Sequence, residues 1–282
     1  MRLFAISDLH LHYEENRRAL VELPPHRDDW LIVAGDVGHR LADLELAWQV
    51  LAERFARVVW APGNHELWTA PNGARELRGE EKYLELVALS RRYGVLTPED
   101  DYAAFPHDGR VYRLAPLFLL YDYSFRPEHL PLEEAVPWAL EAETLCTDEY
   151  YLSPEPHASR AAWCELLCQR AEARLDAVPR EEPLVLINHF PLRRDLVQIA
   201  IPRFIIWCGT RRTEDWHRRY NVEVVVSGHL HVRTTDWRDD VRFEEVSLGY
   251  PRQWQQGKSL ASYLRPIFPS DAAPARGRLR LY

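Results

Sequence analysis

The sequence predicts an α/β sandwich, and three observations lead to this fold class. Short apolar runs rich in β-branched side chains recur along the chain, and each ends in a polar cluster, as buried strands do. Stretches with apolar residues at helical spacing lie between the early runs. Strand and helix therefore alternate, which favours a layered structure in which helices cover sheets.

Five apolar runs are predicted to be strands. Each is short, contains β-branched or aromatic residues, and is followed by Gly, Asn, Asp or Ser, which end strands. The runs span residues 2–7, 30–34, 58–61, 184–187 and 224–226.

Two helices are expected in the first third of the chain. The one over residues 41–55 lies between the second and third predicted strands, and the one over residues 83–93 follows the third. In the first helix Leu44, Trp48 and Leu51 fall on one apolar face, which is the face expected to pack against a sheet.

The middle of the chain is expected to be a helical insert over residues 127–180, with helical patterns at 132–145 and 158–177. We predict one domain over residues 1–265 that contains this insert. Residues 266–282 are rich in Pro and Gly and are predicted to form an irregular tail.

Composition excludes several classes of protein. The chain has 282 residues, 46% of them hydrophobic, and a formal charge of −8. No run approaches the roughly 20 apolar residues of a membrane span, and no signal peptide is recognisable at the charged start. The four cysteines are too few for a disulfide framework, which favours the reducing cytoplasm. The acidic balance argues against nucleic acid as a partner.

Polar clusters at the predicted strand ends carry the chemistry. Because ligands in open α/β sheets bind beyond the carboxyl ends of the strands, we expect these clusters to converge. They are Asp8-Leu9-His10, Gly35-Asp36, Gly63-Asn64-His65-Glu66, His189 and Gly228-His229-Leu230-His231.

Metal ions explain why such side chains would gather. Without cations, the carboxylates would repel one another and the imidazoles would have few partners. The donor set is oxygen and imidazole nitrogen without thiolate, which suits Mn, Fe or Zn and argues against a structural zinc site of the cysteine type.

The five blocks, in this order, resemble the calcineurin-like metallophosphoesterase superfamily. The resemblance implies a four-layer αββα fold with two metal ions, whose paired charges activate a water for attack on phosphorus. It implies one metal on Asp8, His10 and His231, a second on Asn64, His189 and His229, and Asp36 bridging both. It also implies a catalytic His65 beside the scissile phosphate, which donates a hydrogen bond or a proton to the leaving group. Asp43 and Glu66 are candidates for orienting His65. The neighbouring His12 and His39 either support the ligands or contact the substrate, or they are surface residues, which is the favoured interpretation.

A narrower resemblance covers most of residues 3–255. Segments such as 60–68, 147–156 and 207–220 are similar to actinobacterial metallophosphoesterases of the 4′-phosphopantetheinyl hydrolase group. This implies removal of 4′-phosphopantetheine from the serine of a holo acyl or peptidyl carrier protein, with Mn and Fe as the metals.

An arginine-rich segment between two motif blocks is consistent with an acidic carrier protein as partner. Residues 191–220 contain seven arginines and three carboxylates, so a positive rim is expected to steer an acidic partner or phosphate ester. Solvated arginines paired with acidic side chains are the alternative interpretation. The predicted substrate contacts are Arg193, Arg194, Arg211, Arg212, Tyr121 and Tyr123, where the two tyrosines either line a pocket for the pantetheine arm or pack in the core.

Two other functions stay open from the sequence. The first is another soluble metallophosphoesterase, acting on cyclic nucleotides or small phosphomonoesters. The second is a catalytically inactive binding scaffold on the same fold, which would be expected to have lost metal ligands; here every motif residue is present.

Overall fold

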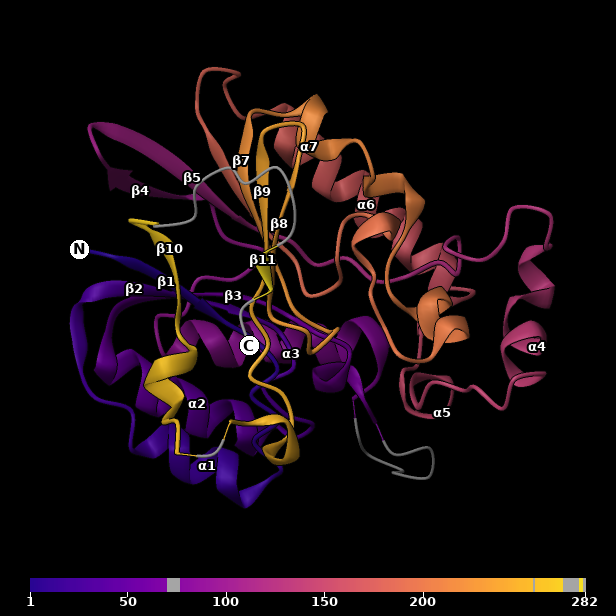
Figure 1. The fold of residues 1–282 in the computed structure, drawn as a ribbon, viewed down its shortest axis with the longest axis horizontal. Helices are drawn as coiled ribbons and strands as arrows, with labels where there is room; N and C mark the ends of the chain where they lie inside the picture. Colours follow the sequence, from indigo (N-terminus) through magenta and orange to yellow (C-terminus); the bar gives the residue numbers. More distant parts are fainter. Residues whose placement is uncertain (70–76, 256, 271–278, 281–282) are drawn as a thin grey trace.

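Two β-sheets pack face to face, and helices cover their outer faces (Figure 1). The computed structural model describes residues 1–69, 77–255, 257–270 and 279–280. The smaller sheet has the strand order β10-β1-β2-β3, and the larger has the order β11-β8-β9-β7-β6-β5-β4. These layers confirm the predicted α/β sandwich.

The smaller sheet is parallel except at one edge. Strands β1, β2 and β3 run parallel, whereas β10 pairs antiparallel with β1. The bounds are Leu3–Ile6 for β1, His26–Ala34 for β2, Phe55–Ala61 for β3 and Arg265–Phe268 for β10. The three predicted strands at 2–7, 30–34 and 58–61 are therefore confirmed, although β2 and β3 begin earlier than expected.

The larger sheet has a parallel centre and antiparallel edges. Strands β5, β6, β7 and β9 run parallel, and β4, β8 and β11 pair antiparallel with their neighbours. The bounds are Ala103–His107 for β4, Arg110–Pro116 for β5, Leu184–Ile187 for β6, Val222–Ser227 for β7, Thr234–Arg238 for β8, Val241–Glu245 for β9 and Leu279–Arg280 for β11. Of these, β6 and β7 confirm the predictions at 184–187 and 224–226.

The helices form two outer layers (Figure 1). Beside the smaller sheet lie α1 (Glu14–Val21), α2 (Leu41–Arg54) and α3 (Gly79–Arg92), and the last two confirm the predicted early helices. Beside the larger sheet lie α6 (Arg160–Asp176) and α7 (Trp216–Arg219). In the part of the chain that the structure describes, every helix is too short or too polar to cross a bilayer.

The predicted insert contains α4 (Ala135–Leu140), α5 (Asp148–Tyr151) and α6. The helix expected over 132–145 is shorter than predicted, because the chain leaves α4 at Leu140 and Glu143 adopts a left-handed backbone with φ 52°. The helix expected over 158–177 is confirmed as α6. Its N-cap is Ser159, whose hydroxyl accepts the N–H of Ala162.

The predicted irregular tail over residues 266–282 is wrong at its start. Strand β10 continues to Phe268, and Ile267 is fully buried between the sheets. Burial of these apolar side chains outweighs the turn-forming effect of Pro266 and Pro269. Strand β11 also lies in this range, while residues 271–278 and 281–282 are outside the described residues.

Alternation of side chains along the strands builds the layers. In β1, Leu3 and Ala5 belong to the apolar layer between the sheets, whereas Phe4 and Ile6 belong to the layer under the helices. Directly after β1, Ser7 forms an isolated parallel β-bridge with Ser247, which follows β9 of the larger sheet. This bridge brings the carboxyl ends of strands from both sheets to one place.

Candidate metal centre

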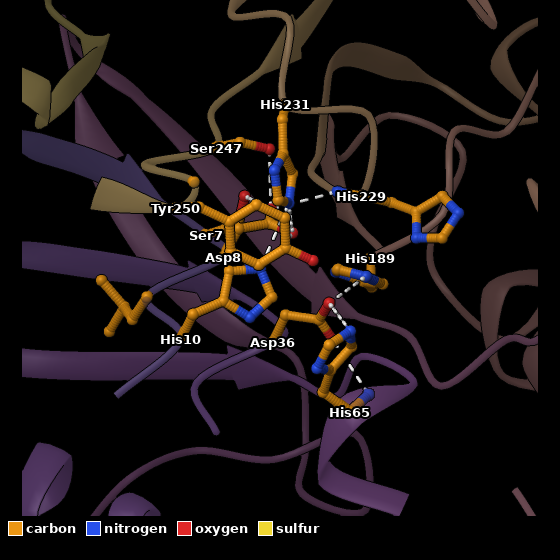
Figure 2. Close-up of polar contacts among 12 residues, drawn as sticks. Ser7, Asp8, His10, Asp36, His65, His189, His229, His231, Ser247 and Tyr250 are labelled. Carbon is orange, nitrogen blue, oxygen red and sulfur yellow. Dashed lines mark hydrogen bonds and ion pairs between the residues drawn. The ribbon is translucent and has the colours of Figure 1, made fainter. Parts of the chain in front are cut away.

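Polar residues that follow five strands converge at one edge of the sandwich (Figure 2). They come from both sheets, as the strand-end rule for α/β proteins predicts. The residues are Asp8 and His10 after β1, Asp36 after β2, Asn64 and His65 after β3, His189 after β6, and His229 and His231 after β7.

One group of donors surrounds the Asp8 carboxylate. Oδ1 of Asp8 lies 2.9 Å from Nε2 of His231 and 3.8 Å from Nε2 of His10, and the two imidazole nitrogens lie 3.2 Å apart. The ligand atoms of Asp8, His10 and His231 all lie within 4.8 Å of one another. This is the spacing of side chains that can hold a metal ion.

A second group surrounds the Asp36 carboxylate. Oδ2 of Asp36 lies 3.3 Å from Nε2 of His189 and 3.7 Å from Nε2 of His65. Asp36 joins two sets of donors that each fit within 4.8 Å, one with Asp8 and His189 and the other with His10 and His65. Asp36 therefore lies between the two groups of donors.

Several buried donor atoms have no partner among the described residues. They include Oδ1 of Asn64 and Nε2 of His229, whereas Nε2 of His189 has only its ion pair with Asp36. Burying a polar atom without a hydrogen bond is costly, and such atoms in native proteins call for an explanation. Metal coordination is such an explanation, because a metal ion binds the lone pairs of amide oxygens and imidazole nitrogens.

The backbone at the cluster is strained. Asp8, His10, Asp36, His229 and His231 all have positive φ, between 43° and 71°. Non-glycine residues in this region cost of order 1–3 kcal/mol each, and they persist where the surrounding structure holds them, often at functional sites. The side chains of Asp8, His10, Asp36 and His231 face one another, whereas the ring of His229 points away from them (Figure 2).

Glycines let the loops approach closely. A Cβ on Gly63 would lie 2.1 Å from Oδ1 of Asp36, and one on Gly228 would lie 2.4 Å from Oδ2 of Asp8. A Cβ on Gly35, whose φ is +86°, would lie 2.6 Å from Nδ1 of His189. The glycines of the motif blocks are therefore required by the packing of the ligand loops.

Neighbouring side chains hold the donors in place. Ser7 and Ser247 donate to Oδ2 of Asp8 over 2.6 and 2.7 Å. Nδ1 of His189 lies 2.9 Å from the carbonyl oxygen of Ala34, and Nδ1 of His231 lies 2.8 Å from Oε1 of Gln253. Partners of this kind fix the orientation of metal-binding side chains.

The charges of the cluster shift the pKa values of the histidines in opposite directions. Burial opposes protonation of His189 and His231, but the nearby Asp36 and Asp8 carboxylates outweigh it and raise their pKa values to about 10 and about 9. Burial, which nearby imidazoles reinforce, lowers the pKa of His229 to about 3. In the metal-free chain the first two therefore carry protons that a metal has to displace.

Comparison with known proteins identifies the family. The family model for calcineurin-like phosphoesterases matches residues 1–233. The chain belongs to the calcineurin-like phosphoesterase family. Over 270 residues it is 45% identical to the acyl-carrier-protein phosphodiesterase PptH of Mycobacterium tuberculosis, a match that covers 95% of this chain and 83% of that protein.

A solved structure gives the same result. The crystal structure of phosphopantetheinyl hydrolase (PptH) from Mycobacterium tuberculosis is 44% identical and matches with a TM-score of 0.91. The match covers 97% of this chain and 98% of that one, so it includes most of the helical insert of the phosphoesterase. The resemblance to this family that the motifs indicated is confirmed.

His65 of the phosphoesterase lies between an indole and a second imidazole. The ring of Trp68 stacks on His65 with centroids 3.8 Å apart, and Nδ1 of His65 lies 2.8 Å from Nε2 of His39. His39 therefore contacts His65, contrary to its interpretation as a surface residue. Burial lowers the pKa of His65 to about 3, so its ring is neutral.

The two carboxylates proposed to orient His65 are occupied elsewhere. Glu66 accepts the backbone N–H groups of Asp36, Val37 and Gly63 over 3.0 to 3.1 Å, so it ties two ligand loops together. Asp43 pairs with Arg17 and Arg40 at the start of α2. These contacts argue against the sequence-based suggestion, because a carboxylate already holding other donors is not free to orient His65.

The two predicted substrate tyrosines differ in their surroundings. Tyr121 is fully buried, as expected from the alternative in which it packs in the core and does not line a pocket. Tyr123 donates to Oε1 of Glu149 over 2.8 Å. Tyr123 thus supports the segment around α5.

The predicted arginine contacts are engaged within the chain. Arg193 binds Asp195, and Arg212 binds Glu165. Arg194 donates to the carbonyl oxygen of Phe125, and Arg211 donates to that of Ser124. The alternative interpretation of paired arginines therefore describes these contacts better than a free positive rim.

Proposed function

We propose that this chain is a two-metal phosphodiesterase that removes 4′-phosphopantetheine from the serine of a holo acyl or peptidyl carrier protein. The observation that carries the proposal is the similarity over nearly the whole chain to a phosphopantetheinyl hydrolase, combined with the groups of Asp and His donors at the strand ends. Products would be the apo carrier protein and 4′-phosphopantetheine.

The donors divide into two metal positions around Asp36. Asp8, His10 and His231 would hold one ion, which their mutual distances support. Asn64, His189 and His229 would hold the other. Asn64 and His229 each present a buried atom without a hydrogen-bond partner, and Nε2 of His189 lies 3.3 Å from the shared Asp36 carboxylate. When bound, two ions activate a water and neutralise the charge of the phosphate.

Oxygen and imidazole donors suit manganese, iron and zinc, and the family resemblance implies manganese and iron among these. The four cysteines are free and buried, and none belongs to a group of donors among the described residues. Free cysteines also suit the reducing environment of the cytoplasm, where carrier proteins are available to the enzyme.

His65 is the residue that donates to the leaving group in the proposed reaction. Its ring is neutral, and its Nδ1 is engaged with His39. If His39 donates to Nδ1, the proton of His65 is on Nε2, which faces the Asp36 carboxylate and the donor cluster. From that atom the neutral ring donates a hydrogen bond to the departing serine oxygen of the carrier protein, which takes its proton from solvent.

A hollow beside His65 suits the pantetheine arm. Its volume is about 880 Å³, and its walls include His39 and Trp68, which both contact the His65 ring. Leu41, Ala42 and Tyr151 add apolar surface. We place the arm in this hollow in preference to the buried Tyr121, so that the phosphate lies at the metals and the carrier protein docks outside.

An intact-mass measurement tests the proposal. The protein is loaded with Mn²⁺ and incubated with a holo carrier protein, and the expected result is loss of the phosphopantetheine group. The metal-chelated protein and an Asp36→Asn variant serve as inactive controls. Unchanged holo protein, together with rapid hydrolysis of cyclic nucleotides or small phosphomonoesters, would establish the alternative phosphoesterase.

A further inference from the structure

A buried carboxylate of the insert touches the proposed metal centre. Asp148 is the first residue of α5 and is fully buried. Its Oδ1 accepts two hydrogen bonds, from Nδ2 of Asn64 over 2.8 Å and from Nε1 of Trp68 over 2.6 Å. Asn64 belongs to the third motif block, and Trp68 lies two residues beyond the end of that block. Asp148, in contrast, is 84 residues away from Asn64 along the chain.

These two contacts determine which way the Asn64 amide faces. The indole Nε1–H of Trp68 can only donate, so Oδ1 of Asp148 is an acceptor. The amide group that faces the same oxygen must then be the NH₂ of Asn64. Its carbonyl oxygen consequently points the other way, where it is buried and has no partner. Metals bind the amide oxygen and not the NH₂ group.

The same carboxylate also positions an aromatic ring. Trp68 stacks on His65 with an interplanar angle of 25°. Since its indole nitrogen is held by Asp148, the plane of the indole is fixed against the catalytic imidazole. One carboxylate therefore links the insert to Asn64 and to His65.

The insert holds Asp148 firmly. Nη2 of Arg160, near the start of α6, donates to the backbone carbonyl oxygen of Asp148 over 2.8 Å. The same guanidinium pairs with Glu149 over 2.9 Å, and Glu149 also accepts from Trp207 and Tyr123. Buried networks in which the members hold one another fix a single arrangement.

We propose that Asp148 is a positioning residue that directs the Asn64 carbonyl oxygen toward the second metal and holds Trp68 against His65. This inference rests on the proposed function for the identity of the centre. It gives the helical insert a part in building the metal site, although Asp148 lies outside the five motif blocks.

Metal content tests the inference without reference to turnover. Asp148→Leu keeps a similar volume but removes the acceptor, so the Asn64 amide loses its fixed orientation. After loading with Mn²⁺ and desalting, we expect the metal content to fall from about two ions per chain to about one. Asp148→Asn retains an acceptor oxygen and serves as the matched control, with metal content close to that of the unaltered chain.

A second substitution separates orientation from general damage. Asn64→Asp in the Asp148→Leu background presents an oxygen whichever way the side chain turns, so the second metal should return. If Asp148 had only a structural role, Asn64→Asp would not restore the second metal. If Asp148→Leu does not fold, Asp148→Ala, alone and combined with Asn64→Asp, provides the same comparison.

The outcomes are distinguishable. Two metals retained in Asp148→Leu, or a second metal that Asn64→Asp does not restore, would overturn the inference. An unaltered chain that binds two metals but leaves holo carrier protein intact would overturn the proposed substrate, while loss and rescue of the second metal would still support the role of Asp148.

Discussion

His39 and His65 face each other through ring nitrogens 2.8 Å apart. A hydrogen bond between two imidazoles needs one donor and one acceptor, so at most one proton lies between them. Because burial lowers the pKa values of both rings, neither takes up a second proton at neutral pH. The pair therefore sets which nitrogen of His65 can donate to a substrate.

Replacing the catalytic imidazole should separate chemistry from metal binding. We expect His65→Ala to lower kcat on holo carrier protein by about 10²–10⁴-fold, since a positioned proton donor contributes that much. Both metals should remain, because His65 is not among the proposed ligands. Activity by intact mass and metal content by elemental analysis would check this. Full activity in the variant would remove His65 from the mechanism.

Replacing His39 should have a smaller effect of the same kind. His39→Ala leaves Nδ1 of His65 without its partner, so the ring can adopt the wrong tautomer. We expect kcat to fall by about 10–100-fold, the usual cost of losing an orienting partner, with KM little changed. His39→Gln, whose amide can still donate, should recover part of the loss. Equal losses in both variants would contradict this role.

Metal binding should depend on pH because protons compete for the same nitrogens. In the metal-free chain the pKa values of His189 and His231 are raised, to about 10 and about 9. Their pairs with Asp36 and Asp8 stabilise the metal-free fold fully below about pH 6.5, the ordinary value, and this contribution is lost as the pH rises through about 9 and 10.

Binding of metal at pH 7 must therefore release protons, and the apparent affinity should increase with pH. Titration calorimetry in two buffers with different ionisation enthalpies measures the protons released. The same buffers with Ca²⁺, which prefers oxygen ligands, provide a control. A binding heat that is independent of the buffer would refute the competition.

Close packing of the ligand loops predicts a steric effect at Gly63. A methyl group there would lie 2.1 Å from Oδ1 of Asp36 and 2.6 Å from its backbone nitrogen. Gly63→Ala should displace Asp36, the residue shared by both proposed metal positions, and abolish tight binding of metal. Gly94→Asn is a suitable control, because nothing lies within 4 Å of its added Cβ and Asn tolerates its φ of +71°. Metal content of the two variants would check the prediction.

The sequence indicated the centre because its ligands lie where strands end. Asp8, Asp36 and His189 each follow a buried apolar run, and the parallel order of these strands brings them to one edge. The hairpin of β8 and β9 was not predicted, although Asp239 and Asp240 gave a turn signal that the structure realises with two positive φ values.

Long-range contacts could not be read from the sequence. Asp148 reaches Asn64 only because α5 folds back over the strand ends, and no periodicity encodes that approach. The arginine-rich segment is similar, because its arginines pair with acidic residues of the insert. The pairs are Arg203 with Glu141, Arg212 with Glu165 and Arg219 with Glu172. Local composition reports the charge of a segment but not the partners that the fold supplies.

The hollow beside His65 offers the last test, because it concerns the arm and not the phosphate. Ala42 lines the hollow, and Ala42→Trp would fill part of its volume of about 880 Å³. We expect the KM for holo carrier protein to rise by about tenfold or more, which corresponds to about 1.4 kcal/mol of binding. A small aryl phosphodiester, which has no arm, should be affected less. Leu84→Trp on α3 is the matched control, since Leu84 is 54% exposed and is not part of the wall. If the two variants have the same KM for the carrier protein, the arm binds elsewhere.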